Sequence, residues 1–300
     1  MPRISERHRY WVANNRVSNA RSGNVDALQK LSTQKRINSL KDDPLGLSSS
    51  LKLRQNLSEI DQMAKNVDFT KGFLDVTESA TGAIFDTLSR AKELAIAMAN
   101  DNYDAQSREA TSKEVSELIS QVIQMGNSKF SGKYVFSGFR SLAPAMDQEG
   151  NFLGDDGEIY LPIGSDQYKK INIPGRDLFE VNIDERGEGH FNMLDSLNLL
   201  RAGMEKNDKD AIYKSLDELD YQMNKVLSFR ASVGASWNAV DNAKTYLTGS
   251  EQQKVENLSR IEDADMYQAT SDFKRTETIL QSTLMATNKL LQPSLLNFMS

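Results

Sequence analysis

Few residues of this chain are of a type and spacing that could do chemistry. The 300 residues include no cysteine and two histidines, His8 and His190. Without cysteine there is no disulfide, no thiolate zinc site and no cysteine nucleophile. Two isolated histidines far apart in sequence do not supply the ligand set of a zinc site, so we interpret both as solvated side chains.

The acidic residues form two short clusters. The run DDGE at 155–158 could attract calcium, but it lacks the alternating ligand spacing and the closing bidentate glutamate of a calcium loop. We interpret it as a turn. The second cluster comprises Glu262, Asp263 and Asp265. At these spacings the side chains point around a helix and do not converge on a site. This cluster is interpreted as a solvated face, or as a partner for basic residues elsewhere.

Motifs for phosphate binding and acyl transfer are missing as well. The dipeptide at 132–133 is an isolated glycine-lysine pair, and the sequence contains neither GxxxxGK[ST] nor GxGxxG. Serine, histidine and aspartate occur, but not in a nucleophile elbow. The sequence therefore predicts no catalytic residue, no metal and no cofactor, and a protein that is not an enzyme.

Charge is spread unevenly along the chain. Residues 1–54 hold eleven Lys/Arg and four Asp/Glu, whereas the whole chain carries −6. A basic arm can bind nucleic acid or lipid, but this arm lacks the tight basic cluster with interleaved aromatics that strand binders use. We therefore expect a polar helical face that neutralises an acidic segment, and no nucleic-acid partner. No apolar run reaches the roughly 18 residues of a membrane span, so no membrane insertion is expected.

The strongest periodic signal covers residues 53–99. Apolar residues recur there in steps of seven with a second set interleaved, which is typical of a coiled coil. A helix of about 45 residues is nearly 70 Å long, so it needs partners of similar length. The residues predicted for the seam between helices are Leu53, Leu57, Ile60, Val67, Leu74 and Leu88, together with Val233, Trp237 and Ile261 from a later segment.

Further helices are predicted to supply those partners. Asp104 or Ser107 is expected to cap a second helix, and the short loop 100–103 makes that helix antiparallel to the first. A third helical region is expected to begin at Asp208, and a last helix is expected to end at Pro293.

The middle of the chain shows a different pattern. Alternating apolar residues predict strands near 159–163, 168–173 and 179–183, separated by Gly- and Asp-rich turns. The predicted fold is mainly α: a long-helix coiled-coil bundle formed by both chain halves, with a small β-rich insertion domain that projects from the far end of the bundle.

This pattern predicts three domains. Residues 1–40 plus 265–300 form a terminal coiled-coil domain that is flexible in the monomer, because its apolar stripe is thin. Residues 41–139 plus 190–264 form the helical bundle, and residues 140–189 form the insertion. Phe273, Leu280, Leu284 and Leu291 make an apolar tail stripe, which is expected to serve assembly and to be covered by a chaperone before that.

Five motifs resemble the signatures of the flagellin superfamily. They are LSTQKRINSLKDDPLGL at 31–47, LSRAKELAIAMAN at 88–100, NSKFSGKYVFSG at 127–138, RASVGASWN at 230–238 and SRIEDADMYQATSDF at 259–273. Within the superfamily the chain looks most like the hook-associated junction proteins of the FlgL type, because of its MPRIS opening and the DDP at 42–44. Gln34 departs from the pattern, since the signature usually has glycine there.

The resemblance implies a structural subunit of the bacterial flagellum. Such subunits are exported through the flagellar type III apparatus without a cleaved signal peptide, and no secretory signal is recognisable here. The implied partners are copies of the same chain in a ring, the first hook-associated protein on one side, flagellin on the other, and a cytosolic export chaperone. Alternatives are a minor flagellin of the filament itself, a helical adhesin or toxin subunit, and an enzyme bound to the filament.

Overall fold

The computed structural model describes residues 6–164, 167–181, 183–187 and 189–296. Eight helices and four strands are assigned among the described residues, and two compact units are formed, residues 1–59 with 250–300 (unit 1) and residues 60–249 (unit 2). The helices are α1 (Glu6–Thr33), α2 (Pro44–Ala99), α3 (Ala105–Gly126), α4 (Arg176–Phe179), α5 (Ile183–Gly187), α6 (Met193–Glu205), α7 (Lys209–Glu262) and α8 (Met266–Leu296). The strands are β1 (Lys129–Phe130), β2 (Lys133–Tyr134), β3 (Tyr160–Gly164) and β4 (Gln167–Lys170).

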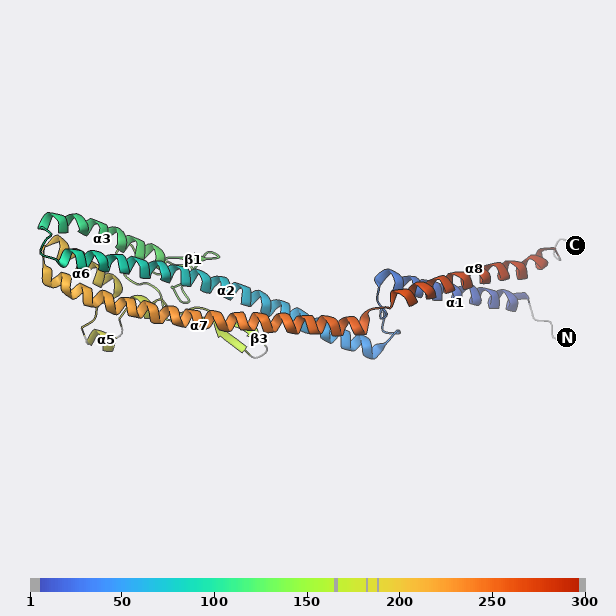
Figure 1. The fold of residues 1–300 in the computed structure, drawn as a ribbon. Helices are drawn as coiled ribbons and strands as arrows, with labels where there is room; N and C mark the ends of the chain where they lie inside the picture. The colour runs from blue at the N-terminus through green and yellow to red at the C-terminus, as the bar shows by residue number, and fades with distance from the viewer. Residues whose placement is uncertain (1–5, 165–166, 182, 188, 297–300) are drawn as a thin grey trace. The chain divides into compact units, whose positions relative to one another are not determined.

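Unit 2 is a bundle whose core runs between its parts of α2 and α7, with α3 and α6 beside them (Figure 1). The heptad stripe of the sequence supplies the α2 side of this core, as expected for a coiled-coil pattern. Side chains with no exposed surface at all include Leu74, Ile84 and Leu88 of α2, Val115 and Val122 of α3, Leu197 and Leu200 of α6, and Ile212 and Leu219 of α7. The prediction of a mainly α fold from both chain halves is confirmed.

The end of the bundle is closed by specific caps. The side chain of Asp104 accepts a hydrogen bond from the backbone N–H of Ser107 at 2.8 Å, which confirms the predicted N-cap. Arg108 is buried, and its guanidinium donates to the carbonyl oxygens of Met98 (2.8 Å) and Asn100 (2.9 Å). These donors satisfy carbonyls at the C-terminus of α2 that have no partner within the helix.

A row of polar pairs fixes the register of α2 against α7 within unit 2. The steps along α2 are three, four and seventeen residues, and each is matched by an equal step backwards along α7, as an antiparallel pair requires. The pairs are Asp68 with Lys244 (2.7 Å), Lys71 with Asp241 (2.7 Å), Asp75 with the indole N–H of Trp237 (2.7 Å), and Lys92 with Asp220. A slip by one helical turn would break all of them together.

The strands form two small antiparallel hairpins, β1 with β2 and β3 with β4. The predicted strands near 159–163 and 168–173 are confirmed in position, but the strand predicted at 179–183 is wrong. Phe179 is instead the last residue of α4, and Ile183 is the first residue of α5. A short apolar run does not distinguish a strand from a buried helical turn, and here the amides of Leu178 and Phe179 are taken by the carbonyl of Gly175.

The insertion does not project from the bundle, so that expectation is wrong. Met146, Leu178 and Phe179 are buried in the same hydrophobic core as the long helices. The ring of Phe179 lies 5.5 Å from that of Phe136, which in turn lies 6.2 Å from Phe229 of α7. Two-stranded hairpins cannot bury their own apolar side chains, so these pack against the helices. Deleting residues 141–189 would therefore uncover the core and would not leave it intact.

Unit 1 contains α1 and α8, which lie side by side (Figure 1). Ala13 and Ala27 of α1 are buried in unit 1, whereas Phe273 and Leu280 of α8 are half-buried. The prediction that the last helix ends at Pro293 is wrong, because α8 continues to Leu296. In the last turn of a helix a proline removes only one backbone hydrogen bond, which the helix tolerates.

Leu74→Asp should destabilise unit 2 by at least about 4 kcal/mol, because it places an unpaired carboxylate where the native side chain has no exposed surface. Urea denaturation followed by circular dichroism measures the loss. Leu227→Asp on α7 is the matched control, since Leu227 is 46% exposed and its substitution should change little. Unchanged stability of the Leu74 variant would contradict its place in the core.

Candidate assembly site

The first part of the site is the place in unit 1 where two non-helical segments meet. We call residues 34–43 and 263–265 together the crossing. The amide of Ala264 donates to the carbonyl of Gln34 at 2.9 Å, and the amide of Arg36 donates to the carbonyl of Glu262 at 2.6 Å. Lys35 and Asp263 form an isolated antiparallel bridge between them. These backbone hydrogen bonds connect two non-helical segments that are more than 200 residues apart in sequence.

A buried carboxylate holds the crossing together. The side chain of Glu262 is only 5% exposed and binds Arg54 with both oxygens, at 2.9 and 2.5 Å, and Lys35 at 2.9 Å. The hydrogen bond from Arg54 is the largest cause that lowers the pKa of Glu262 to about 2; burial opposes it, and Lys35 and Ser50 add to it. Of the two interpretations of the acidic cluster, Glu262 therefore follows the second: its side chain is a partner for the basic N-terminal segment and does not lie on a solvated face.

Gln34 adopts a backbone conformation that favours glycine. Its φ is +58°, in the left-handed region, at the residue where α1 has ended and the crossing begins. A non-glycine residue there costs about 1 kcal/mol. The carbonyl of Gln34 accepts the hydrogen bond from Ala264, so the turn is required to align the two segments.

The predicted seam residues occupy two different environments. Val67, Leu74, Leu88 and Val233 are fully buried in unit 2, and Ile60 is nearly so. Trp237 is half-buried, with Lys71 Nζ 4.3 Å above its ring. Leu53 and Leu57 of α2 and Ile261 of α7 are half-buried in unit 1. The role of these residues in holding assembled subunits stays a prediction.

The tail stripe is only partly covered. Phe273 and Leu280 are half-buried against the rest of unit 1, whereas Leu284 is 43% exposed. The side chain of Leu291 lies outside the described residues. On α8, Met285 is exposed as well, so apolar surface remains available for a partner.

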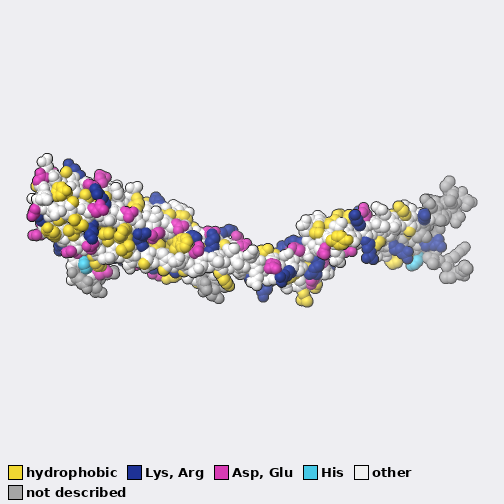
Figure 2. Space-filling model, viewed as in Figure 1, with side chains coloured by type: hydrophobic (Ala, Val, Ile, Leu, Met, Phe, Trp, Pro, Cys, Tyr) yellow, Lys and Arg dark blue, Asp and Glu magenta, His cyan; other side chains and the backbone are white. Residues whose placement is uncertain are grey.

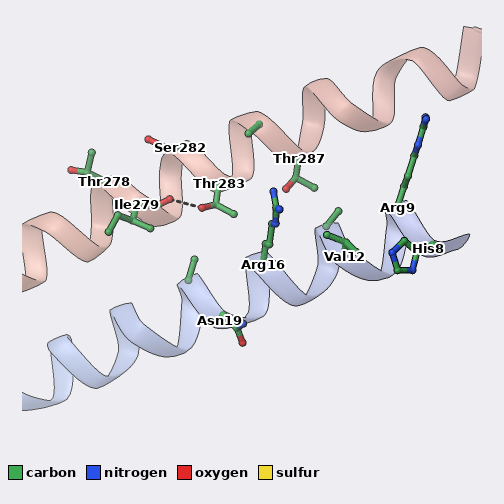
Figure 3. A pocket seen from close by; sticks show the side chains of 13 residues that line it. His8, Arg9, Val12, Arg16, Asn19, Thr278, Ile279, Ser282, Thr283 and Thr287 are labelled. Carbon is green, nitrogen blue, oxygen red and sulfur yellow. Dashed lines mark hydrogen bonds between the residues drawn. The ribbon is translucent and has the colours of Figure 1, made fainter. Parts of the chain in front are cut away.

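Two grooves flank the contact of α1 and α8. The first, which we call the cationic groove, has a volume of about 1190 Å³ and is lined by His8, Arg9 and Arg16 of α1 and by Thr278, Ser282, Thr283 and Thr287 of α8, among others. Figure 3 shows Arg9 and Arg16 extending from α1 toward the side of α8, and Thr283 and Thr287 projecting from α8 toward α1. In Figure 2 dark blue basic side chains gather over the part of α1 near the N-terminus.

The second groove, which we call the aromatic groove, has a volume of about 560 Å³. It is lined by Tyr10, Trp11, Ala13, Asn14 and Val17 of α1 and by Leu284 and Thr287 of α8. Sequence reasoning missed both grooves. The available signal is the position of Arg9 and Arg16 close to Tyr10 and Trp11 in the sequence, but this does not show which residues face one side of a helix pair.

Two features of the described residues bear on the chemistry of the site. Within the described part of the chain, no group of three His, Asp or Glu side chains is arranged to hold a metal ion. In that same part, no helix combines the length and the apolar character needed to cross a bilayer.

Long paired helices from both halves of the chain, tied together by the buried carboxylate of Glu262, define a mainly helical protein. Comparison with protein families agrees: the bacterial flagellin N-terminal helical region matches residues 4–141, and the bacterial flagellin C-terminal helical region matches residues 216–299. The chain therefore belongs to the flagellin family and is a structural protein of the bacterial flagellum.

Individual relatives are distant but cover most of the chain. The flagellin FlaB1 of Treponema pallidum is 26% identical over 262 residues, which cover 85% of this chain and 84% of the relative. The flagellar hook-associated protein 3 of Escherichia coli is 22% identical over 276 residues, covering 86% and 87%. A solved structure of a putative flagellar hook-associated protein from Vibrio parahaemolyticus is similar in fold, with a TM-score of 0.67, 20% identity, and coverage of 74% of this chain and 100% of that one.

Replacing Glu262 by Gln should destabilise unit 1 by about 2 to 3 kcal/mol at pH 7, because the pKa of Glu262 is lowered in the folded state. Since that pKa falls from an ordinary value of 4.5 to about 2, the contribution is complete above pH 4.5 and is lost as the pH falls toward 2. Denaturation of both proteins between pH 3 and 7 measures the difference.

The control for this prediction is Glu256→Gln, which removes an exposed ion pair with Arg260 on the same helix. Such pairs contribute little, so stability should stay as in the native chain at every pH. A Glu262→Gln difference that does not shrink on acidification would show that the carboxylate is not the origin of the effect.

Proposed function

We propose that this chain is the subunit of the ring that joins the hook-associated zone of the flagellum to the flagellin filament. The observation that carries the proposal is that a hook-associated protein 3 aligns over 86% of this chain and 87% of its own length, while the structure of a putative hook-associated protein matches 74% of this chain with the whole of its own length. The MPRIS opening and the DDP of the crossing support it.

The physical properties of the chain suit a joining subunit. Terminal helices with exposed apolar residues leave surface for copies of the same chain, for the first hook-associated protein on one side, and for flagellin on the other. Export through the flagellar type III apparatus requires an unfolded chain, and a sequence without cysteine cannot form disulfides that would prevent unfolding. The role is structural and uses no enzymatic reaction and no cofactor.

A second candidate is a minor flagellin that polymerises in the filament itself. The observation that favours it is the similarity to the flagellin of Treponema pallidum at 26% identity. The two functions differ in how growth ends: a flagellin extends from filament seeds without limit, whereas a junction subunit stops after a thin layer.

A strain that lacks this chain should build hooks but fail to retain filaments, and it should release flagellin into the medium. Electron microscopy of the cells and immunoblotting of the medium measure both effects, and the reintroduced gene should reverse them. A full-length filament on the deletion strain would support the minor flagellin instead.

We also propose that an export chaperone covers the tail stripe before secretion, through a helix-in-groove contact. The stripe contains Phe273, Leu280 and Leu284 among its described residues, and burial of such side chains contributes roughly 1.5–3 kcal/mol each before the cost of ordering the tail. A micromolar or tighter complex follows from that range.

Leu280→Asp and Leu284→Asp should each weaken binding of the full-length chain to its chaperone by at least about tenfold. Isothermal titration measures the dissociation constants. The matched control is Lys274→Asp, an exposed polar site on the same helix. Equal binding by a chain that lacks residues 273–300 would place the chaperone contact elsewhere.

A further inference from the structure

The helix pair of unit 1 presents different chemistry on its two sides. Residues 7–21 contain four arginines and one histidine and no acidic residue. None of the 13 residues that line the cationic groove is acidic either. The groove therefore concentrates positive charge from Arg9 and Arg16 beside a row of threonine and serine hydroxyls, and no carboxylate among its lining residues neutralises that charge.

The aromatic groove lies on the other side of the same contact. Ala13 and Thr287 line both grooves, so the grooves open on opposite sides of the line where α1 meets α8. Arg9 and Arg16 are seven residues apart and share one face of α1, whereas Tyr10 and Val17 share the neighbouring face. Trp11 is 62% exposed and stacks on His8 with the ring centres 6.0 Å apart.

We propose that the cationic groove of one copy receives the exposed rim of the aromatic groove of a second copy, which carries Tyr10 and Trp11, so that Arg16 of the first copy lies over the face of the Trp11 ring that His8 leaves open. A guanidinium over an indole face is attracted by the negative charge of the ring face. This inference rests on the proposed function and specifies which surfaces of neighbouring subunits meet.

Charge complementarity decides between the ways in which two copies can meet. A two-fold contact through the cationic groove would place arginine against arginine, and like charges facing each other repel. A two-fold contact through the aromatic groove would leave Arg9 and Arg16 without a partner in the second copy. A head-to-tail contact places cation against ring at every interface, and because such a contact leaves one free groove at each end, it repeats into a ring or a helical array.

The absence of cysteine makes the contact open to a cross-linking test without background. Asn19→Cys marks the cationic groove, and Asn14→Cys marks the aromatic groove. Both single variants are produced together in the deletion strain, flagella are isolated, and a short thiol-reactive cross-linker is added. The expected product is a dimer that joins position 19 of one copy to position 14 of the next, as mass spectrometry of the linked peptides identifies.

Variants of the proposed contact provide the matched controls. Trp11→Leu keeps an apolar side chain without a large ring, and Arg16→Gln removes the cation; each should lower the yield of the 14–19 product by roughly two- to thirtyfold. Arg16→Lys keeps the cation, so this variant should retain most of the yield of the 14–19 product. Yields that Trp11→Leu and Arg16→Gln leave unchanged would overturn the inference.

The products also separate this inference from the proposed function. Only 14–14 or 19–19 products, or no product from flagella that contain the protein, would overturn the head-to-tail contact alone. The last result is also the one expected if an acidic protein or a lipid surface fills the cationic groove. Absence of the protein from flagella would overturn the proposed function and this inference with it.

Discussion

A long amphipathic helix can be stable in water only if something of similar length covers its apolar stripe. Here α2 has 56 residues and α7 has 54, and they come from opposite halves of the chain. Neither half can bury its stripe alone, because α3 and α6 have only 22 and 13 residues. The halves must therefore fold together, and the remaining elements of unit 2 are arranged around that pairing.

Hydrophobic stripes alone leave the register of such a pair poorly defined, because a slip of one turn still buries leucine against leucine. In unit 2 the polar row from Asp68 to Lys92 removes this ambiguity, since each member has one partner on α7. In unit 1 the alignment of the two chain halves is defined by Glu262. A buried carboxylate is costly to leave unpaired, so any arrangement that separates it from Arg54 and Lys35 is disfavoured. Both devices therefore select one register of the helices.

The sequence predicted those features that depend on periodicity and on local capping. The stripe at 53–99 follows from spacing, and the start of α7 near Asp208 and a cap at Asp104 or Ser107 follow from residue type; the structure has the stripe and the start of α7, and it selects Asp104 as the cap. The errors concern features that tertiary contacts decide. The alternation at 179–183 comprises only three apolar residues, which is too short to separate a strand from short helices, and the effect of Pro293 depends on its place in the last turn of α8.

The candidate site was predictable to a lesser degree, for a related reason. The seam residues on α2 follow from heptad spacing, but the partner of Glu262 comes from more than 200 residues away, and no local pattern encodes that pairing. The two grooves likewise depend on how α1 rotates against α8. The sequence shows that arginines and aromatic residues lie close together at 7–16. It does not show that the two kinds of residue lie on separate sides of a helix pair, as they do in the structure.

The α1 and α8 pair buries few large side chains completely among its described residues. Ala13 and Ala27 are buried, Phe273 and Leu280 are half-buried, and larger side chains such as Trp11 and Met285 are 62% and 65% exposed. Burying an alanine contributes far less than the roughly 1–2 kcal/mol that ordering each residue's backbone costs. The pair therefore depends on its larger half-buried side chains, Phe273 and Leu280 among them, and the exposed ones leave apolar surface open to a partner.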